Sequence, residues 1–310
     1  MSRYSVGSKE PTKEKQRVDL MELRPGSLFA NLLTIGNGVC GFAALVELSK
    51  IVEPQAPELL ESNIRHQMIA GYLILLGMLF DAFDGKVARM VKGSTELGAQ
   101  LDSLCDLVTF GVVPAFMIVQ INLGGDPRWV HMVWFLALAY FLGALLRLAR
   151  FNVENAPEED AHLCFKGLPS PAAAGCVASL VIFQAYVLQA RQAEFHWFSA
   201  PVLAELQQLA GSITYFMPFL AIFLGFTMVS SRLKFEHIGS RIFAAAHSWE
   251  FFVSLVFAAV LLAVVPEVFL PIAFVGYLVW TPVKFIFRLV FFGRRRRTEH
   301  EEEPEALQRG

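Results

Sequence analysis

Long runs of apolar residues, separated by short polar connections, occupy most of this 310-residue chain. A helix needs about 20 predominantly apolar residues to cross roughly 30 Å of hydrocarbon, so runs of this length predict membrane-spanning helices. The pattern therefore predicts an all-α fold, a polytopic membrane helix bundle with about eight transmembrane helices. The predicted spans are Ser27–Ser49, Met68–Met90, Asp102–Leu123, Trp129–Phe151, Leu168–Ala190, Leu209–Ser230, Trp249–Val264 and Glu267–Phe292.

The composition supports a membrane protein. Hydrophobic residues make up 55% of the chain and charged residues only 17%, with a mean hydropathy of +0.49, whereas soluble domains carry about 25% charged residues. These values exclude a disordered chain and a nucleic-acid-binding module. The four cysteines lie in or beside apolar runs and lack metal-ligand spacing, so they are interpreted as reduced thiols that contribute to packing.

The uneven distribution of charge predicts the orientation of the helices. Of the 26 Lys and Arg residues, 22 fall on the two termini and on alternate connections, which lie on one side of the predicted bundle. Lys50, Arg65, Arg128 and Arg191 fall on the other side. Because short cytoplasmic segments are enriched in Lys and Arg, both termini are expected to face the cytoplasm.

Acidic side chains are scarce within the predicted spans, because a charge at membrane depth is costly, but one segment is rich in them. It reads DAFDGKVARMVKGSTELGAQLDSLCD and runs from Asp81 to Asp106 across the turn between the second and third spans. At about 100° per residue, Asp81 and Asp84 share one helix face, and Asp102 and Asp106 share another. The turn brings these faces together, so four carboxylates are predicted to converge.

Four converging carboxylates need compensating positive charge. Hard oxygen ligands favour Mg²⁺, Mn²⁺ or Ca²⁺ over Zn²⁺, so the segment predicts a divalent metal site. Gly85, Ala88 and Gly98 leave space for a ligand to approach the backbone, and Arg89 offers a phosphate partner. A carboxylate-bound metal beside an arginine is an arrangement that holds a diphosphate during phosphoryl transfer.

Two other interpretations of the acidic segment stay open. The carboxylates could form ion pairs with Lys86, Arg89 and Lys92 at a membrane boundary, although such pairing does not require small residues in register with the acids. Intramembrane acids could also belong to a cation transporter. Transporter sites, however, lie near the midplane between repeats, whereas this segment lies at a predicted cytoplasmic turn and we see no second copy.

The acidic segment matches the pattern DxxDGxxAR, eight residues, then GxxxDxxxD, and so resembles the signature of the CDP-alcohol phosphatidyltransferase family. The resemblance implies a membrane enzyme, usually a homodimer, that uses a divalent metal to bind a CDP-linked lipid or alcohol and releases CMP. It also implies roles for single residues. The implied metal ligands are Asp81, Asp84, Asp102 and Asp106, of which Asp106 is also the implied catalytic base; the implied CDP and phosphate contacts are Gly85, Ala88, Arg89 and Gly98.

Three polar residues of the first predicted span lie about one turn apart on one helix face. They are Asn31, Thr34 and Asn37, within a segment that resembles the opening helix of the family. They are candidates for contacts to the nucleotide. The alternative is that they form interhelical hydrogen bonds at a packing seam of small residues.

Four segments resemble the phosphatidylserine synthase branch of the family. They are Asp102–Ala115, Arg147–Asn152 (RLARFN), Phe165–Gly175 (FKGLPSPAAAG) and Met228–Phe235. This resemblance implies transfer of the phosphatidyl group from CDP-diacylglycerol to the hydroxyl of L-serine, giving phosphatidylserine and CMP. Another acceptor, such as glycerol 3-phosphate, inositol phosphate or choline, is the alternative within the same chemistry.

Serine carries a carboxylate and an ammonium group, so its binding site should offer a cation and hydrogen-bond acceptors. Arg147, Arg150, Asn152 and Lys166 flank the predicted cytoplasmic turn between the fourth and fifth spans. These residues are the candidates for acceptor binding, since Arg recognises a carboxylate through two parallel hydrogen bonds and Lys acts as a point charge. The alternative is that the cations anchor the helix ends at the cytoplasmic surface.

These inferences divide the chain into four parts. Residues 1–26 form a cytoplasmic tail, 27–235 the catalytic helical bundle, 236–293 the C-terminal transmembrane helices and 294–310 a charged cytoplasmic tail. The expected location is a bacterial inner membrane, with the active site facing the cytoplasm.

Overall fold

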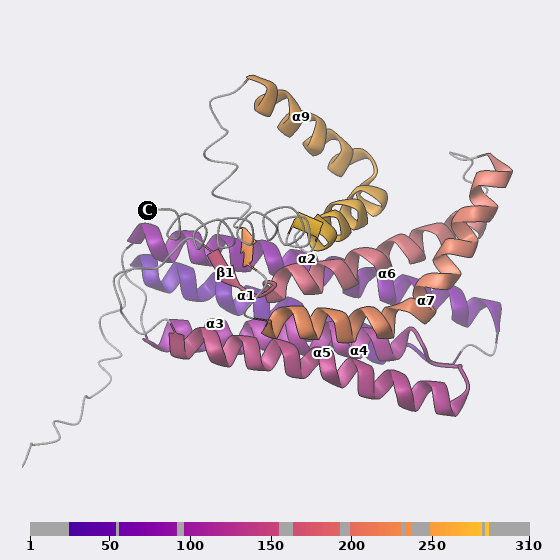
Figure 1. Cartoon of the computed structure of the whole chain (residues 1–310), viewed down its shortest axis with the longest axis horizontal. Coiled ribbons are helices and arrows are strands. Elements are labelled where there is room, and N and C mark those ends of the chain that lie inside the picture. The colour runs from indigo at the N-terminus through magenta and orange to yellow at the C-terminus, as the bar shows by residue number, and fades with distance from the viewer. Residues whose placement is uncertain are drawn as a thin grey trace, which may run out of the picture.

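The computed structural model contains a bundle of long helices that lie side by side (Figure 1). Within the described residues, six helices are long and apolar enough to cross a membrane. The prediction of a multi-pass, helical membrane protein is confirmed for these six spans. The structure describes residues 25–53, 56–91, 96–154, 164–192, 199–230, 234–236, 249–280 and 283–284.

The helices follow the order of the predicted spans, and the third span consists of three consecutive pieces that include a π-helix. In chain order the elements are α1 (Pro25–Ser49), α2 (Pro57–Val91), α3 (Glu96–Asp106), the π-helix η1 (Leu107–Val112), α4 (Val113–Gln120), α5 (Pro127–Glu154), α6 (Ser170–Gln192), α7 (Ala200–Val229), α9 (Trp249–Val264) and a last helix, Pro266–Trp280.

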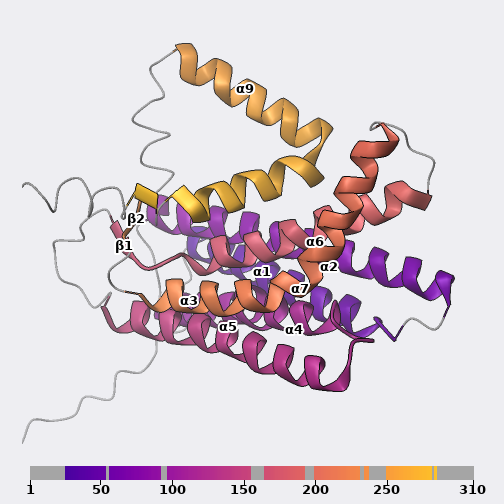
Figure 2. The same cartoon turned by 45° about the vertical axis from the view of Figure 1, so that its right-hand side comes forward.

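The two C-terminal helices are shorter than the six spans. Helix α9 has 16 residues, which corresponds to roughly 24 Å at 1.5 Å per residue. Pro266–Trp280 is also too short to count among the spans, and the predicted eighth span runs to Phe292, beyond the described residues. Both figures place α9 away from the other helices, whereas the yellow C-terminal helix lies along the bundle (Figure 2).

Helices α2 and α7 begin well before the residues that the apolar pattern predicts. Helix α2 begins at Pro57 instead of Met68, and α7 begins at Ala200 instead of Leu209. Proline is favoured in the first turn of a helix, where its missing N–H removes no hydrogen bond, and Pro57 and Pro201 occupy such positions. The prediction missed these turns because it used runs of apolar residues, and the turns that extend each helix beyond its apolar run contain polar residues.

Helix α6 lies at the centre of the bundle. Of its apolar span 72% is buried, against 50% or less for each of the other five. Ala173, Ala174 and Ala178 are fully buried on it, and a side chain at Gly71 of α2 would overlap Ile182. Small residues allow helix backbones to approach closely within a membrane. The large apolar side chains on the outer helices are free to face lipid.

The π-helix η1 has a local cause in the sequence. In a regular α-helix the Phe110 carbonyl would accept the amide N–H of residue 114, but residue 114 is a proline and has no N–H. The backbone widens instead, so that the Val113 N–H bonds to the Val108 carbonyl. The buried Tyr140 hydroxyl donates to the Phe110 carbonyl at 2.9 Å. This change of register directly follows Asp106, as π-helical turns often do at functional sites.

A two-stranded antiparallel sheet joins the segments before α6 and after α7 in the otherwise helical structure that the sequence predicted. Its strands are β1 (Cys164–Lys166) and β2 (Lys234–Glu236). Gly167 adopts a φ of 88°, and a side chain there would overlap the Met228 carbonyl. The Leu168 N–H donates to the Thr227 carbonyl at 3.0 Å. These contacts fix the start of α6 to the end of α7.

Candidate active site

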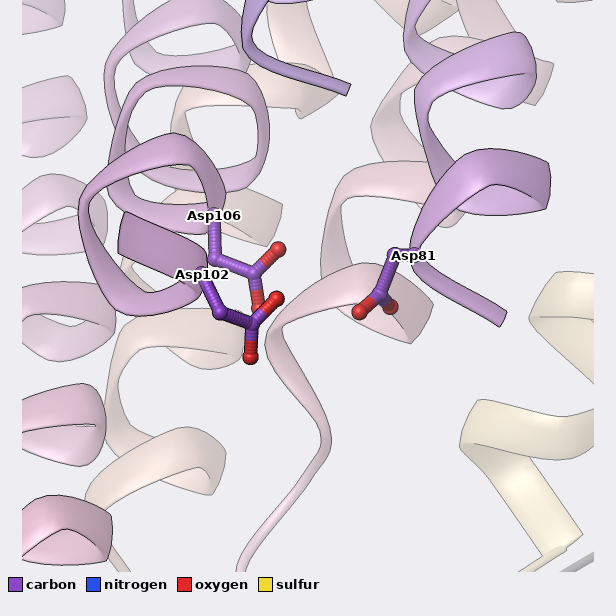
Figure 3. Close-up of side chains that lie close together, drawn as sticks. All are labelled: Asp81, Asp102 and Asp106. Carbon is purple, nitrogen blue, oxygen red and sulfur yellow. The ribbon is translucent and has the colours of Figure 1, made fainter. Parts of the chain in front are cut away.

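Three carboxylates from two helices lie close together (Figure 3). Asp81 lies near the end of α2, and Asp102 and Asp106 lie one turn apart on α3. One oxygen of each carboxylate lies within 4.8 Å of the others. The structure thus brings together three of the four predicted acidic residues, through the helix periodicity that the spacing indicated.

The fourth acidic residue, Asp84, lies outside this group of three. Its side chain is buried, and its Oδ2 accepts a hydrogen bond of 2.8 Å from the Thr34 hydroxyl of α1. The carboxylate is still close enough to Asp102 and Asp106 to interact electrostatically with both. Asp84 therefore adds negative charge to the site while α1 fixes its orientation.

Helix α1 also holds Asp106. The Asn37 amide donates to Oδ1 of Asp106 at 2.9 Å, and the Thr109 hydroxyl donates to the Asn37 carbonyl at 3.0 Å. A side chain at Gly41 would overlap Thr109, and one at Gly77 would come within 2.9 Å of the Asn37 amide oxygen. Glycines at these two positions allow the helices to approach closely enough for the hydrogen bonds to form.

The three polar residues predicted on one face of α1 do not all have the same partners. Thr34 and Asn37 are buried and hold acidic side chains of the site, as described above, and Asn31 is half-buried one turn earlier. The interpretation as interhelical hydrogen bonds is confirmed for Thr34 and Asn37. Contact of any of the three with a nucleotide stays a prediction.

The residues of the site fit a divalent cation. Oδ1 of Asp102 is buried and accepts no hydrogen bond from the described part of the chain. A buried carboxylate oxygen without a donor is energetically costly, and several clustered carboxylates do not all stay ionised without positive charge. A cation bound among Asp81, Asp102 and Asp106 would remove both costs. Oxygen donors of this kind suit Mg²⁺, Mn²⁺ or Ca²⁺.

The motif residues beyond the acids lie on α2 and α3, the two helices that carry the three carboxylates. Gly85 is exposed, and a side chain there would meet no described atom within 4 Å. Packing within the chain therefore does not explain the glycine, whereas close approach of a ligand would. The exposed Arg89 donates from Nε to the Gly85 carbonyl at 2.9 Å. Gly98 lies in the first turns of α3, and Ala88 lies in α2 with its side chain outside the described residues.

Arg147 of α5 is the candidate cation that faces the acids. Its guanidinium interacts electrostatically with Asp106 and Asp81, and Nη1 donates to the Ser170 hydroxyl at 2.9 Å. Its Nε is buried and donates to no acceptor in the described part of the chain. A partly buried guanidinium with an unused donor beside a polar site is suited to bind an anionic oxygen of a ligand.

The other candidate acceptor residues lie nearby on α5 and β1. Asn152 is exposed, and its Oδ1 accepts a hydrogen bond of 3.0 Å from Ser103 of α3. Arg150 is half-buried one turn after Arg147. Lys166 lies in β1, and its side chain is outside the described residues. Arg147 is connected to the three-carboxylate group through its electrostatic interaction with Asp81 and Asp106.

Ser170 and Ser103 are site residues that sequence reasoning missed. Ser170 is fully buried at the start of α6. Serine followed by proline is a common signal for the beginning of a helix. The residue was therefore explained by its helix-start role, and its hydrogen bond with Arg147 was not predicted. Ser103 lies between Asp102 and Asp106 in the motif but had no signal of its own.

Comparison with known proteins identifies the class of the chain. The sequence profile of the CDP-alcohol phosphatidyltransferase family matches residues 27–204. Because the match covers more than half of the chain, the protein belongs to this family. The family resemblance predicted from the acidic motif is confirmed, and all six spans begin within the matched region.

Curated relatives with similar sequences share one name, CDP-diacylglycerol–serine O-phosphatidyltransferase. The chain is 36% identical to the Saccharomyces cerevisiae protein over 166 residues, 52% of this chain and 54% of that protein. It is 34% identical to the Bacillus subtilis protein over 149 residues, 48% and 72% of the two chains. It is 30% identical to the protein of Helicobacter pylori strain 26695 over 165 residues, which are 52% of this chain and 60% of that protein. The chain thus spans about half the length of the yeast relative.

Proposed function

We propose that this protein transfers the phosphatidyl group of CDP-diacylglycerol to the hydroxyl of L-serine, giving phosphatidylserine and CMP. The observation that carries the proposal is the convergence of Asp81, Asp102 and Asp106 within a family of CDP-alcohol phosphatidyltransferases. The names of the relatives support serine as the acceptor. The RLARFN and KGLPSPAAAG segments, which contribute Arg147 and Ser170 to the site, support it further.

Asp81, Asp102 and Asp106, with Asp84 beside them, would hold the divalent metal, Mg²⁺ or Mn²⁺, with Ca²⁺ as a further ion that the site could bind. The metal would neutralise charge on the diphosphate. Asp106 is the proposed base. One of its oxygens, Oδ1, accepts the Asn37 hydrogen bond, so Oδ2 takes the proton of the serine hydroxyl. The serine oxygen forms a bond to the phosphatidyl phosphorus as the bond to the bridging oxygen breaks and CMP leaves.

The remaining parts of the proposal concern the whole protein in its membrane. We propose eight membrane-crossing helices, with α9 and the following C-terminal helix as the last two, and both termini in the cytoplasm. The distribution of Lys and Arg supports this orientation, with the active site on the cytoplasmic face of a bacterial inner membrane. We also propose a homodimer, which the family resemblance supports, and we assign the catalytic bundle to residues 27–235.

The decisive assay uses the full chain in detergent with CDP-diacylglycerol and isotopically labelled serine. We expect labelled phosphatidylserine and CMP with Mn²⁺ or Mg²⁺, and neither product after chelation. Asp106→Asn should abolish turnover while largely preserving CDP binding, since the amide keeps the shape of the side chain but is not a base. If glycerol 3-phosphate, inositol phosphate or choline were used instead of serine, the proposed acceptor would be wrong. Metal uptake into vesicles without cleavage of CDP-diacylglycerol would indicate a transporter.

A further inference from the structure

The C-terminal helix Pro266–Trp280 lies outside the region that matches the family, which ends at residue 204, but it packs directly on the catalytic bundle. Figure 2 shows this yellow helix along the bundle, whereas α9 stands away from it. Its Leu278 side chain is only 4% exposed, and Phe274 and Tyr277 pack against the main core. The helix therefore belongs structurally to the bundle that carries the acidic site.

Two contacts fix the position of this helix. Near its start, Glu267 accepts a hydrogen bond of 3.0 Å from the Tyr72 hydroxyl of α2. In its middle, the Phe274 ring occupies the space above Gly175 of α6, where any side chain would overlap it. The helix is thus held by α2, which carries Asp81, and by α6, which carries Ser170.

The last turns of the helix carry a polar side chain, Tyr277, that packs against the main core. The Tyr277 phenol and the Arg147 guanidinium interact electrostatically, and Tyr277 is half-buried against the core. The polar partners of Arg147 thus include Ser170, the carboxylates of Asp81 and Asp106, and Tyr277 of the C-terminal helix. In a poorly solvated site, each such neighbour contributes to where a guanidinium points.

We propose that the C-terminal helix completes the active site, with Tyr277 acting as a positioning residue that directs Arg147 toward an anionic group of a substrate. This inference rests on the proposed function for the reaction. The anionic group is either the carboxylate of the acceptor or a phosphate oxygen of the CDP-linked donor. Both present the same chemistry to a guanidinium, and substrate kinetics distinguish them.

The test compares Tyr277→Phe, which keeps the ring and removes the hydroxyl, with Tyr72→Phe. Tyr72→Phe removes the hydrogen bond to Glu267 at the other end of the same helix. We expect Tyr277→Phe to raise KM about tenfold, the size expected for a lost interaction with a charged group, for the substrate that Arg147 binds. The value of kcat should change by less than about twofold, because Asp106 is untouched. Tyr72→Phe should change KM little, because the Phe274 ring above Gly175 and the buried Leu278 still dock the helix.

A double-mutant cycle then separates positioning from a general effect on packing. Arg147→Lys should raise the same KM, and adding Tyr277→Phe should raise it little further, because Tyr277 acts through Arg147. Thermal unfolding in detergent confirms that each variant is folded. A rise in KM for serine assigns Arg147 to the acceptor carboxylate, and a rise for CDP-diacylglycerol assigns it to the donor phosphates; both support the proposal.

Two results would overturn it: an unchanged KM for both substrates in folded Tyr277→Phe, or independent, additive effects in the cycle. The cycle is run with whichever acceptor the unmodified protein uses. Failure of serine to react would therefore count against the proposed function alone. An unchanged KM in Tyr277→Phe would count against the positioning role alone.

Discussion

Asn37 of α1 donates a hydrogen bond to Oδ1 of Asp106 in α3 across 2.9 Å, although the two residues are 69 positions apart in the chain. Both side chains are buried. The Asn37 backbone is held in turn by the Thr109 hydroxyl, which lies in the π-helix that follows Asp106. The amide thus selects the direction in which the proposed base presents its second oxygen.

Asn37→Ala is expected to lower kcat by about tenfold or more, because a general base contributes only when it is correctly placed. KM should change less, since the metal-binding oxygens stay. CMP release with Mn²⁺ measures the effect. Asn63→Ala is the matched control: Asn63 is buried as well, and it bonds both the N–H and the carbonyl of Val52, in the connection between α1 and α2. Equal losses of kcat in the two folded variants would contradict the role assigned to Asn37.

Asp102→Asn is expected to weaken Mn²⁺ binding by about tenfold or more, as loss of a ligand or of its support does at metal sites. The substitution removes the negative charge from a carboxylate whose buried Oδ1 has no donor in the described part of the chain. Titration of Mn²⁺, followed by electron paramagnetic resonance, measures affinity without turnover. Asp126→Asn is the control, because Asp126 is exposed and accepts a hydrogen bond from the Arg128 N–H at 2.8 Å. Unchanged Mn²⁺ affinity in Asp102→Asn would exclude the proposed metal site.

The convergence of Asp81, Asp102 and Asp106 was predictable because it depends on helix periodicity and on one turn between neighbouring spans. The direction of Asp84 was not, because it depends on Thr34, which lies on a different helix. Sequence spacing places residues on a face but does not say which neighbouring helix that face meets. The same reason explains why Asn37 was predicted as a polar residue of α1 but not as the partner of Asp106.

The π-helix, the two short strands and the role of Tyr277 were not predicted, because the residues that form them are compatible with several structures. Pro114 indicated a helix irregularity only in principle, since proline is tolerated within membrane helices. The hydrogen bond from Tyr140 to the Phe110 carbonyl of the π-helix comes from another helix and had no signal in the sequence. The strands β1 and β2 are three residues each, too short for a period-two pattern to be recognised. Tyr277 lies in the last predicted span and had no polar neighbour in sequence that would indicate a site.

Tyr140→Phe tests whether the π-helix needs its side-chain donor. The substitution removes the hydrogen bond to the buried Phe110 carbonyl, and we expect a loss of about 1 kcal/mol in the free energy of unfolding. Thermal unfolding in detergent measures it as a lower Tm. Tyr215→Phe is the matched control, because Tyr215 is 64% exposed and contacts Trp129 through its ring, which phenylalanine keeps. An equal, small change in both variants would show that Tyr140 does not support η1.

Gly175→Ala tests the docking of the C-terminal helix. The added methyl group would overlap the Phe274 ring, and overpacking of this kind costs about 1–3 kcal/mol, so Tm should fall. Gly211→Ala is the control, because a side chain at Gly211 meets no described atom within 4 Å; it should be neutral or slightly stabilising, since alanine favours the helix.

Shortening the opposing side chain should reverse the effect. Phe274→Leu alone leaves space above Gly175 and lowers Tm, but in the Gly175→Ala background the smaller side chain makes room for the methyl group. The double variant should therefore be more stable than the sum of the two single losses, which is the sign of direct contact. If the losses were additive, or if Gly175→Ala were as stable as Gly211→Ala, the C-terminal helix would not pack on α6 at this position. It could not then hold Tyr277 beside Arg147.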